Sequence, residues 1–232
     1  MKRALISLSA LSIAALPALA ETKDFPVGSF SNIDVNGGIK VLYETGAETT
    51  VIVEQAEGDF SDISIETDDG ELQIGRESLG FLKSLRANLH VDLVEGDLRV
   101  KVNGKRMPSY TVRVTSPSIS ELDVAQSSIL EASGIDAGKI ELDASSSAKL
   151  IVSGRAASAD ITVDASSSAD VEAKDLLCKS AEIEASSSAD VSVSVTEALE
   201  AKASSGADIN VHGAPTQVDI TESSGGDISI KS

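Results

Sequence analysis

Four aspartates recur at one position of a serine-rich repeat in the second half of the chain. The string Ala-Ser-Ser-Ser-Ala ends at Ala169 and again at Ala189, and an aspartate follows each of these copies and two looser ones: Asp170, Asp190, Asp208 and Asp227. Carboxylates stacked in neighbouring strands repel one another unless a cation or a hydrogen bond offsets the charge. The column is therefore a weak Ca²⁺ candidate or a solvated acidic face. The absence of the G-G-x-G-x-D pattern of calcium-binding β-rolls favours the acidic face, and no other metal site is predicted.

A basic segment between residues 76 and 113 contrasts with the rest of this acidic chain. It carries four acids and eight basic residues: Arg76, Lys83, Arg86, Arg99, Lys101, Lys105, Arg106 and Arg113. One interpretation is a solvated face of a folded region, since charge clusters usually lie at the surface. The other is a binding patch for an anionic envelope polymer or for the acidic surface of another copy.

Motifs for catalysis or cofactor binding do not occur in the sequence. It holds no P-loop, no dinucleotide-binding or nucleophile-elbow string and no zinc motif, and His90 and His212 are its only histidines. We therefore predict a non-enzymatic protein with no catalytic residues and no cofactor. The alternative is a carbohydrate-active enzyme, a lyase or glycosidase, because β-helices carry such activities. No two carboxylates stand out as the acid–base pair that it would need.

The repeat itself predicts the architecture. Its copies recur every 18 to 21 residues from Ala125 onward, and segments that alternate apolar and polar residues flank each one. A strand, a small-residue turn and a second strand at this period are typical of a parallel β-solenoid. We predict an all-β fold, a single-stranded parallel β-helix with about 20 residues per coil, over residues 121–232. The single cysteine, Cys178, excludes an intrachain disulfide and reads as a small buried apolar residue.

The composition agrees with narrow coils. Hydrophobic residues make up 41% of the 232 residues but aromatic residues only 3%, and none lies beyond residue 120. A coil that rises ~4.8 Å leaves little room for rings inside. Residues 29–120 also read as short strands, and the aromatics they contain suit an N-terminal β-rich cap that seals the solenoid. Residues 79–86 are expected to form one or two helical turns.

The first twenty residues have the pattern of a targeting signal. Lys2 and Arg3 precede an apolar stretch, and Ala18-Leu19-Ala20 is a cleavage signature, so residues 1–20 are predicted to be a cleaved signal peptide. Residues 21–28 would be a short extension and 29–232 a single domain. No later stretch is long and apolar enough to be a transmembrane segment. The formal charge of −18 argues against nucleic acid as a partner.

Three stretches of the sequence resemble one bacterial family. Residues 29–41, the step Pro117–Val124, and residues 211–228 are similar to the opening, the entry into the repeats and the end of head GIN domains (DUF2807). The resemblance implies a β-helical domain of exported envelope proteins, periplasmic or at the outer surface, described as an adhesin head. It carries no catalytic residues. The partner would be an envelope polymer, a surface protein or a second copy, and a self-assembling structural subunit is a further alternative.

Overall fold

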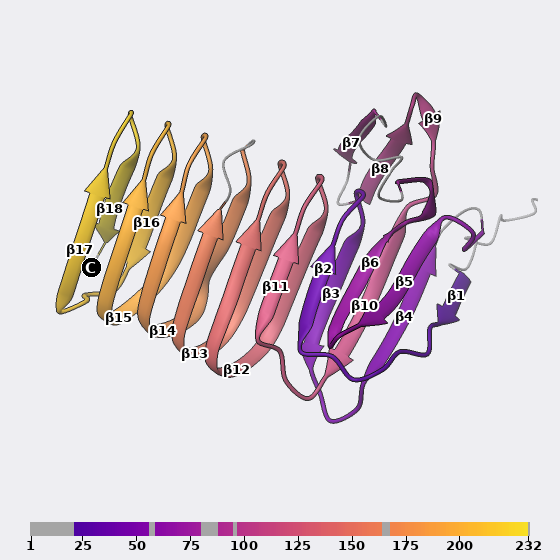
Figure 1. Ribbon diagram of the computed structural model, residues 1–232, viewed down its shortest axis with the longest axis horizontal. Coiled ribbons are helices and arrows are strands. Elements are labelled where there is room, and N and C mark those ends of the chain that lie inside the picture. Colours follow the sequence, from indigo (N-terminus) through magenta and orange to yellow (C-terminus); the bar gives the residue numbers. More distant parts are fainter. Residues whose placement is uncertain (1–20, 56–58, 80–87, 95–96, 164–167, 232) are drawn as a thin grey trace, which may run out of the picture.

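The computed structural model describes residues 21–55, 59–79, 88–94, 97–163 and 168–231. Within these ranges the chain forms strands and one 3-10 helix, η1 (Glu77–Leu79), and no α-helix. Figure 1 shows one elongated body, with stacked coils at the C-terminal end and a broader cap at the N-terminal end. The predicted all-β solenoid is thus confirmed.

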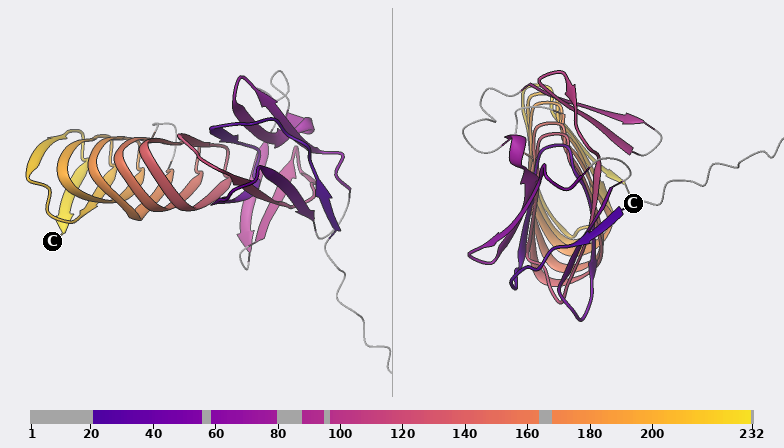
Figure 2. Two further views of the ribbon diagram at one scale, coloured as in Figure 1. Left: turned by 90° about the horizontal axis from the view of Figure 1, so that it is seen from below. Right: turned by 90° about the vertical axis from the view of Figure 1, so that its right-hand side faces the viewer.

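The solenoid coils consist of two strand segments separated by a tight turn on one side and a bend on the other (Figure 2). The strands that build the coils are β11 (Glu121–Val124), β12 (Ile129–Ala144), β13 (Lys149–Val163), β14 (Asp170–Ala185), β15 (Asp190–Ala203), β16 (Asp208–His212), β17 (Gln217–Glu222) and β18 (Asp227–Lys231). Neighbouring coils pair in parallel and in register, so that Lys149, Asp170 and Asp190 are direct partners. Successive coils are therefore about 20 residues apart, as the repeat predicts.

We call the two sheets by their position relative to the serine turns. The entry sheet leads into the turns and contains β11, β17 and the C-terminal halves of β12 to β15. The exit sheet leaves the turns and contains the N-terminal halves of β12 to β15 with β16 and β18. Register shifts in the middle of the long strands mark the bends that join the sheets.

The serine turns hold two consecutive residues in the left-handed region. In the turn at 186–189, Ser187 has φ +53° and Ser188 has φ +63°, and the Ala189 N–H donates to the Ser186 carbonyl at 3.3 Å. This is the type I′ geometry of tight strand connections, which usually selects Asn or Gly. The Ser188 N–H also donates to the Ser205 carbonyl of the next turn at 3.2 Å. Stacking of the turns thus supports a conformation that serine alone disfavours.

The core is a set of aliphatic columns that run along the solenoid. On the entry sheet Leu122 and Leu142 are partners and fully buried, and on the exit sheet Val171, Val191 and Ile209 are stacked in the same way. Cys178 belongs to this core at 1% exposure, and burial raises the pKa of its thiol to about 11. The prediction that it is a buried apolar residue is confirmed.

The N-terminal region continues both sheets, but not in chain order. Its strands are β1 (Glu21–Asp24), β2 (Asn32–Val35), β3 (Lys40–Thr45), β4 (Thr50–Gln55), β5 (Ile63–Asp68), β6 (Glu71–Arg76) and β10 (Tyr110–Ser116). β2 lies between β11 and β6, and β3 lies between β12 and β10, all in parallel. β4, β5 and β1 then pair antiparallel on the outside. The residues expected to be an extension before residue 29 thus include a paired strand, β1.

Antiparallel strands close the N-terminal end of the solenoid. The inward residues Val51, Val53 and Ile63 of the outer strands are at most 5% exposed, and Phe25 and Phe60 pack against the same core. A cap was predicted here, and its position is confirmed. The helical turns expected at residues 79–86 fall outside the described residues except for Leu79, which ends η1.

The left-handed turns generate a stability prediction. Ser188→Gly removes the cost of holding an L-residue in the left-handed region, about 1 kcal/mol. It adds a cost of similar size, because glycine loses more conformational entropy on folding, so the melting temperature should stay constant or rise slightly. Ser192→Gly, in extended backbone of β15, has only the entropy cost and should lower the melting temperature by about 2–4 °C. Circular dichroism melting of both variants checks this. Equal losses would contradict strain at Ser188.

Candidate functional site

A small antiparallel sheet carries the exposed part of the predicted basic patch. It consists of β7 (Leu89–Val94), β8 (Asp97–Val102) and β9 (Lys105–Arg106), and it stands beside β2 and β3 in Figure 1. The insertion takes the place of a serine turn between β6 and β10. We call its exposed cations, Arg99, Lys101, Lys105 and Arg106, the basic hairpin surface.

Strand alternation places these cations outward. Leu98, Val100 and Val102 are at most 6% exposed and pack with Leu79 in a core cluster of their own, so the residues between them face solvent. Lys101 lies directly opposite Arg106 on β9 and opposite His90 on β7. Within the described residues none of the four cations of the basic hairpin surface forms an ion pair with an acid. Asp92 lies opposite Arg99 on β7, so the positive charge is concentrated around Lys101, Lys105 and Arg106.

A glycine allows the hairpin to dock on the first coil. Gly38 has φ +69°, and a Cβ added there would lie 2.8 Å from Val91 Cγ2 and 3.2 Å from Val100 Cγ2. The apolar underside of the hairpin thus rests directly on the backbone of the turn between β2 and β3. The basic surface is fixed to the solenoid and not carried on a free loop.

Arg76, predicted for the patch, lies elsewhere. Its side chain is fully buried, with Nη1 2.7 Å from Asp62 Oδ2. Nε donates to the Gly37 carbonyl at 2.6 Å and Nη2 to the Pro108 carbonyl at 2.9 Å. It therefore ties β5, the first turn and the end of the hairpin insertion together, and it is not part of the exposed surface.

The remaining predicted cations are separate from the hairpin or lie outside the described residues. Arg113 projects from β10 and pairs with Glu54 on β4, with Nε to Oε1 at 2.7 Å. Lys83 and Arg86 lie among residues that the structure does not describe. The structure thus brings four of the eight predicted cations together.

A shallow groove of about 400 Å³ crosses the exit sheet next to Arg113. Its floor includes Leu42, which lies in register between Arg113 and Glu131, and its walls are these longer charged side chains. The Glu131 carboxylate is 2.9 Å from Lys40 Nζ. The other lining residues are Tyr43, Glu44, Val114, Thr115, Ala132, Ser133, Ile151 and Ser153. Since both charged walls already have partners, the groove offers less free charge than the hairpin.

The aspartate column is in register, as its repeat position predicts. Asp170, Asp190, Asp208 and Asp227 are successive partners on the exit sheet. Lys149 stands at the start of the column, and its Nζ is 2.7 Å from Asp170 Oδ2. Among the residues that the structure describes, no three His, Cys, Asp or Glu side chains are arranged to hold a metal ion. The acidic face remains the favoured interpretation and the cation column the alternative.

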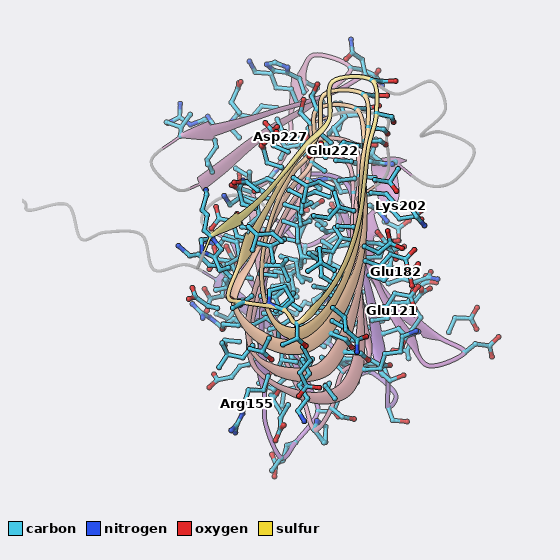
Figure 3. All side chains as sticks on the ribbon, turned by 90° about the vertical axis from the view of Figure 1, so that its left-hand side faces the viewer. Glu121, Arg155, Glu182, Lys202, Glu222 and Asp227 are labelled. Carbon is cyan, nitrogen blue, oxygen red and sulfur yellow. The ribbon has the colours of Figure 1, made fainter. Side chains whose placement is uncertain are left out.

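Two further columns of carboxylates line the entry sheet, and they were not predicted from the serine repeat. One column contains Glu71, Glu121, Glu141, Glu182, Glu200 and Asp219, and the other contains Asp34, Asp123, Asp143 and Glu184. Figure 3 shows Glu121 and Glu182 on the same side of the molecule. Alternations such as Glu141-Leu142-Asp143 are the sequence pattern that indicates these columns, because stacked repeats place equivalent residues side by side.

Crowding changes the acidity of this face. Burial and the charges of Asp34 and Asp143 raise the pKa of Asp123 to about 7. Burial and the charge of Glu71 raise the pKa of Asp34, partly offset by a hydrogen bond from Asn36. Burial and the charge of Glu141 raise the pKa of Glu121, whose carboxylate accepts a hydrogen bond from Asn32 at 2.7 Å. The centre of the face thus holds less negative charge near neutral pH than its sequence implies.

The geometry defines a class of protein: an elongated β-solenoid with charged flat faces and no enclosed catalytic site among the described residues. Within the same ranges no helix is long and apolar enough to cross a membrane. Residues 29–215 match the family described as putative auto-transporter adhesin, head GIN domain (DUF2807), and the chain belongs to this family. The resemblance predicted from the sequence is confirmed.

Solved structures share the fold at low identity. A putative adhesin from Bacteroides fragilis is 15% identical with a TM-score of 0.65, and the match covers 91% of this chain and 97% of that one. A putative adhesin from Parabacteroides merdae is 15% identical with a TM-score of 0.51, covering 92% and 97%. A putative lipid binding protein from Parabacteroides distasonis is 18% identical with a TM-score of 0.50, also covering 92% and 97%. No curated protein matches the sequence.

The hairpin contact predicts a difference between two glycines. Gly38→Ala and Gly70→Ala both place an L-residue in the left-handed region, at φ +69° and +84°, at a cost of about 1 kcal/mol. Only Gly38→Ala also overpacks Val91, whereas a Cβ at Gly70 has no atom within 4 Å. We expect Gly38→Ala to lose a further 1–3 kcal/mol, about the usual cost of overpacking. Urea unfolding measures both, and equal losses would refute tight docking.

The entry-sheet carboxylates predict a pH dependence. The folded-state pKa of Asp123, about 7, lies above its ordinary 3.8, so ionisation of Asp123 destabilises the fold. Its contribution to stability is complete below about pH 4 and is lost as the pH rises to about 7. Asp123→Asn should therefore match the parent protein near pH 4 and exceed it at pH 8. After discounting for solvent screening, we expect a gain of about 1–2 kcal/mol.

Thermal melts at both pH values check this prediction. Asp175→Asn, at an exposed position in the bend of β14 opposite Ser153, is the control and should show a smaller difference between pH 4 and pH 8 than Asp123→Asn. An Asp123→Asn gain of the same size at both pH values would show that charge crowding is not its cause.

Proposed function

We propose that the chain is an exported, non-enzymatic binding domain of the bacterial envelope, and that the basic hairpin surface binds an anionic polymer. The observation that carries the proposal is the gathering of Arg99, Lys101, Lys105 and Arg106 on a docked sheet, where none of the four forms an ion pair among the described residues although Asp92 lies opposite Arg99. The family description and the adhesin-named structures support a binding or adhesion role.

The charge distribution limits where on the molecule an anionic polymer can bind. Three columns of carboxylates run along the solenoid and repel polyanions, so attraction is confined to the N-terminal end where the hairpin stands. A regularly charged chain suits the hairpin because Lys101 and Arg106 are directly opposite on adjacent strands, with Cα atoms ~5 Å apart. The signal peptide predicted over residues 1–20 would deliver the domain to the periplasm or the outer surface.

Binding to immobilised dextran sulfate and to polygalacturonate tests the proposal, with affinity measured between 50 and 300 mM NaCl. The triple variant Arg99→Gln, Lys101→Gln, Arg106→Gln should weaken binding at least tenfold, since three exposed charge contacts contribute about 2 kcal/mol together. Affinity of the parent protein should fall as salt screens these charges.

A triple variant on the bend side of the solenoid provides the matched control. Arg155→Gln, Lys174→Gln, Lys179→Gln removes the same total charge from exposed positions and should change affinity less than twofold. Equal effects of the two triples would reject the hairpin as the site. Release of new reducing ends from polygalacturonate would instead support the carbohydrate-active enzyme.

A further inference from the structure

The two ends of the solenoid differ in how they are closed. At the N-terminal end the inward residues of β4 and β5 are buried, and β1 pairs with the outer edge of β4. At the C-terminal end the last coil, β17 and β18, exposes the residues that continue the core columns. Val218, Ile220 and Ile230 are 47%, 38% and 40% exposed, whereas their partners Leu199, Ala201 and Val211 in the preceding coil are at most 3% exposed.

The last coil also presents strand edges. β17 pairs with β15 and β18 pairs with β16, and neither has a second neighbour among the described residues. Unpaired edges with apolar inward residues are the usual starting point of edge-to-edge association.

One residue of the last coil breaks the pattern of its column. Among residues whose side chains are described, the inward position at the end of the entry strands is occupied by Ile74, Val35, Val124, Ala144, Ala185, Ala203 and finally Glu222. Six aliphatic residues are thus followed by a carboxylate. Figure 3, which looks onto this end, shows Glu222 and Asp227 close to the last serine turn.

The Glu222 side chain occupies the free edge of the coil. Its Oε1 accepts a hydrogen bond from the Ile228 N–H of β18 at 2.8 Å, an amide that stands just after the turn. A further coil stacked here would bury this carboxylate in an aliphatic column, without water. Burial of an unpaired charge is strongly unfavourable, and inward charges are a known protection of sheet edges.

We infer that the C-terminal edge is a self-complementary pairing surface and that Glu222 prevents a second copy from docking on it. A second copy is the partner that fits. When two copies meet at this end about a two-fold axis, their edge strands pair antiparallel, so the same surface of each copy forms the interface. The N-terminal end is a poorer partner for this edge, because the inward residues of β4 and β5 are already buried there. The aliphatic columns would then meet columns of the same kind, as they do between coils.

Sedimentation equilibrium of residues 21–232 from about 1 to 300 μM tests the inference. We expect the parent protein to be monomeric, and Glu222→Val to dimerise with a dissociation constant at least tenfold lower. Asp219→Val is the matched control, because it exchanges an acid for valine on the outward face of the same strand. It should leave the protein monomeric.

Further variants locate the contact and guard against misfolding. Adding Ile220→Lys to Glu222→Val should restore the monomer. Should Glu222→Val not fold, as judged by circular dichroism, Glu222→Gln against Asp219→Asn repeats the comparison with smaller changes. Four results would overturn the inference: a monomeric Glu222 variant at 300 μM, equal association of its Asp219 control, a parent protein that dimerises equally well, or no rescue by lysine. The hairpin at the other end is unaffected by these variants.

Discussion

Stacking of strands at ~4.8 Å is the constraint on which the whole structure depends. Because coils pair in register, every residue lies beside its counterpart in the next coil. Inside, this allows continuous aliphatic columns such as Val171, Val191 and Ile209, and it leaves little space for rings. Outside, the same rule brings equal charges together, and burial together with these neighbouring charges raises the pKa of Asp123.

The coils can be predicted from the sequence because stacking in register requires similar residues at equivalent positions, which appear in the sequence as a repeat. Copies of the serine string set the period, and alternation around them sets which residues face inward. The N-terminal region repeats nothing, so neither the insertion of β2 and β3 between later strands nor the antiparallel closure could be derived from spacing. Arg76 was grouped with surface cations because charge in a sequence carries no information on burial, which here depends on Asp62 and two distant carbonyls.

The charges divide the molecule into regions with different roles. Acids populate the flat solenoid faces, where stacking multiplies each one into a column, and four cations gather on a hairpin that belongs to no coil. Because the hairpin insertion is not stacked between coils, its residues need not match those of a neighbouring coil, and it can carry cations where the coils carry acids. The regular coils hold this insertion at one end, and the carboxylates along their length repel polyanions.

The strand order of the N-terminal region sets an order of folding. Both parallel neighbours of β3, namely β10 and the start of β12, follow it by more than 60 residues in the chain. Contacts so distant in sequence form late, because loop closure precedes any gain from pairing. β2 has a parallel partner in β6 as soon as residues 71–76 are present, whereas β3 has none until β10 at residues 110–116. The exit sheet of the N-terminal region therefore cannot close around β3 before the hairpin insertion between β6 and β10 has been added to the chain.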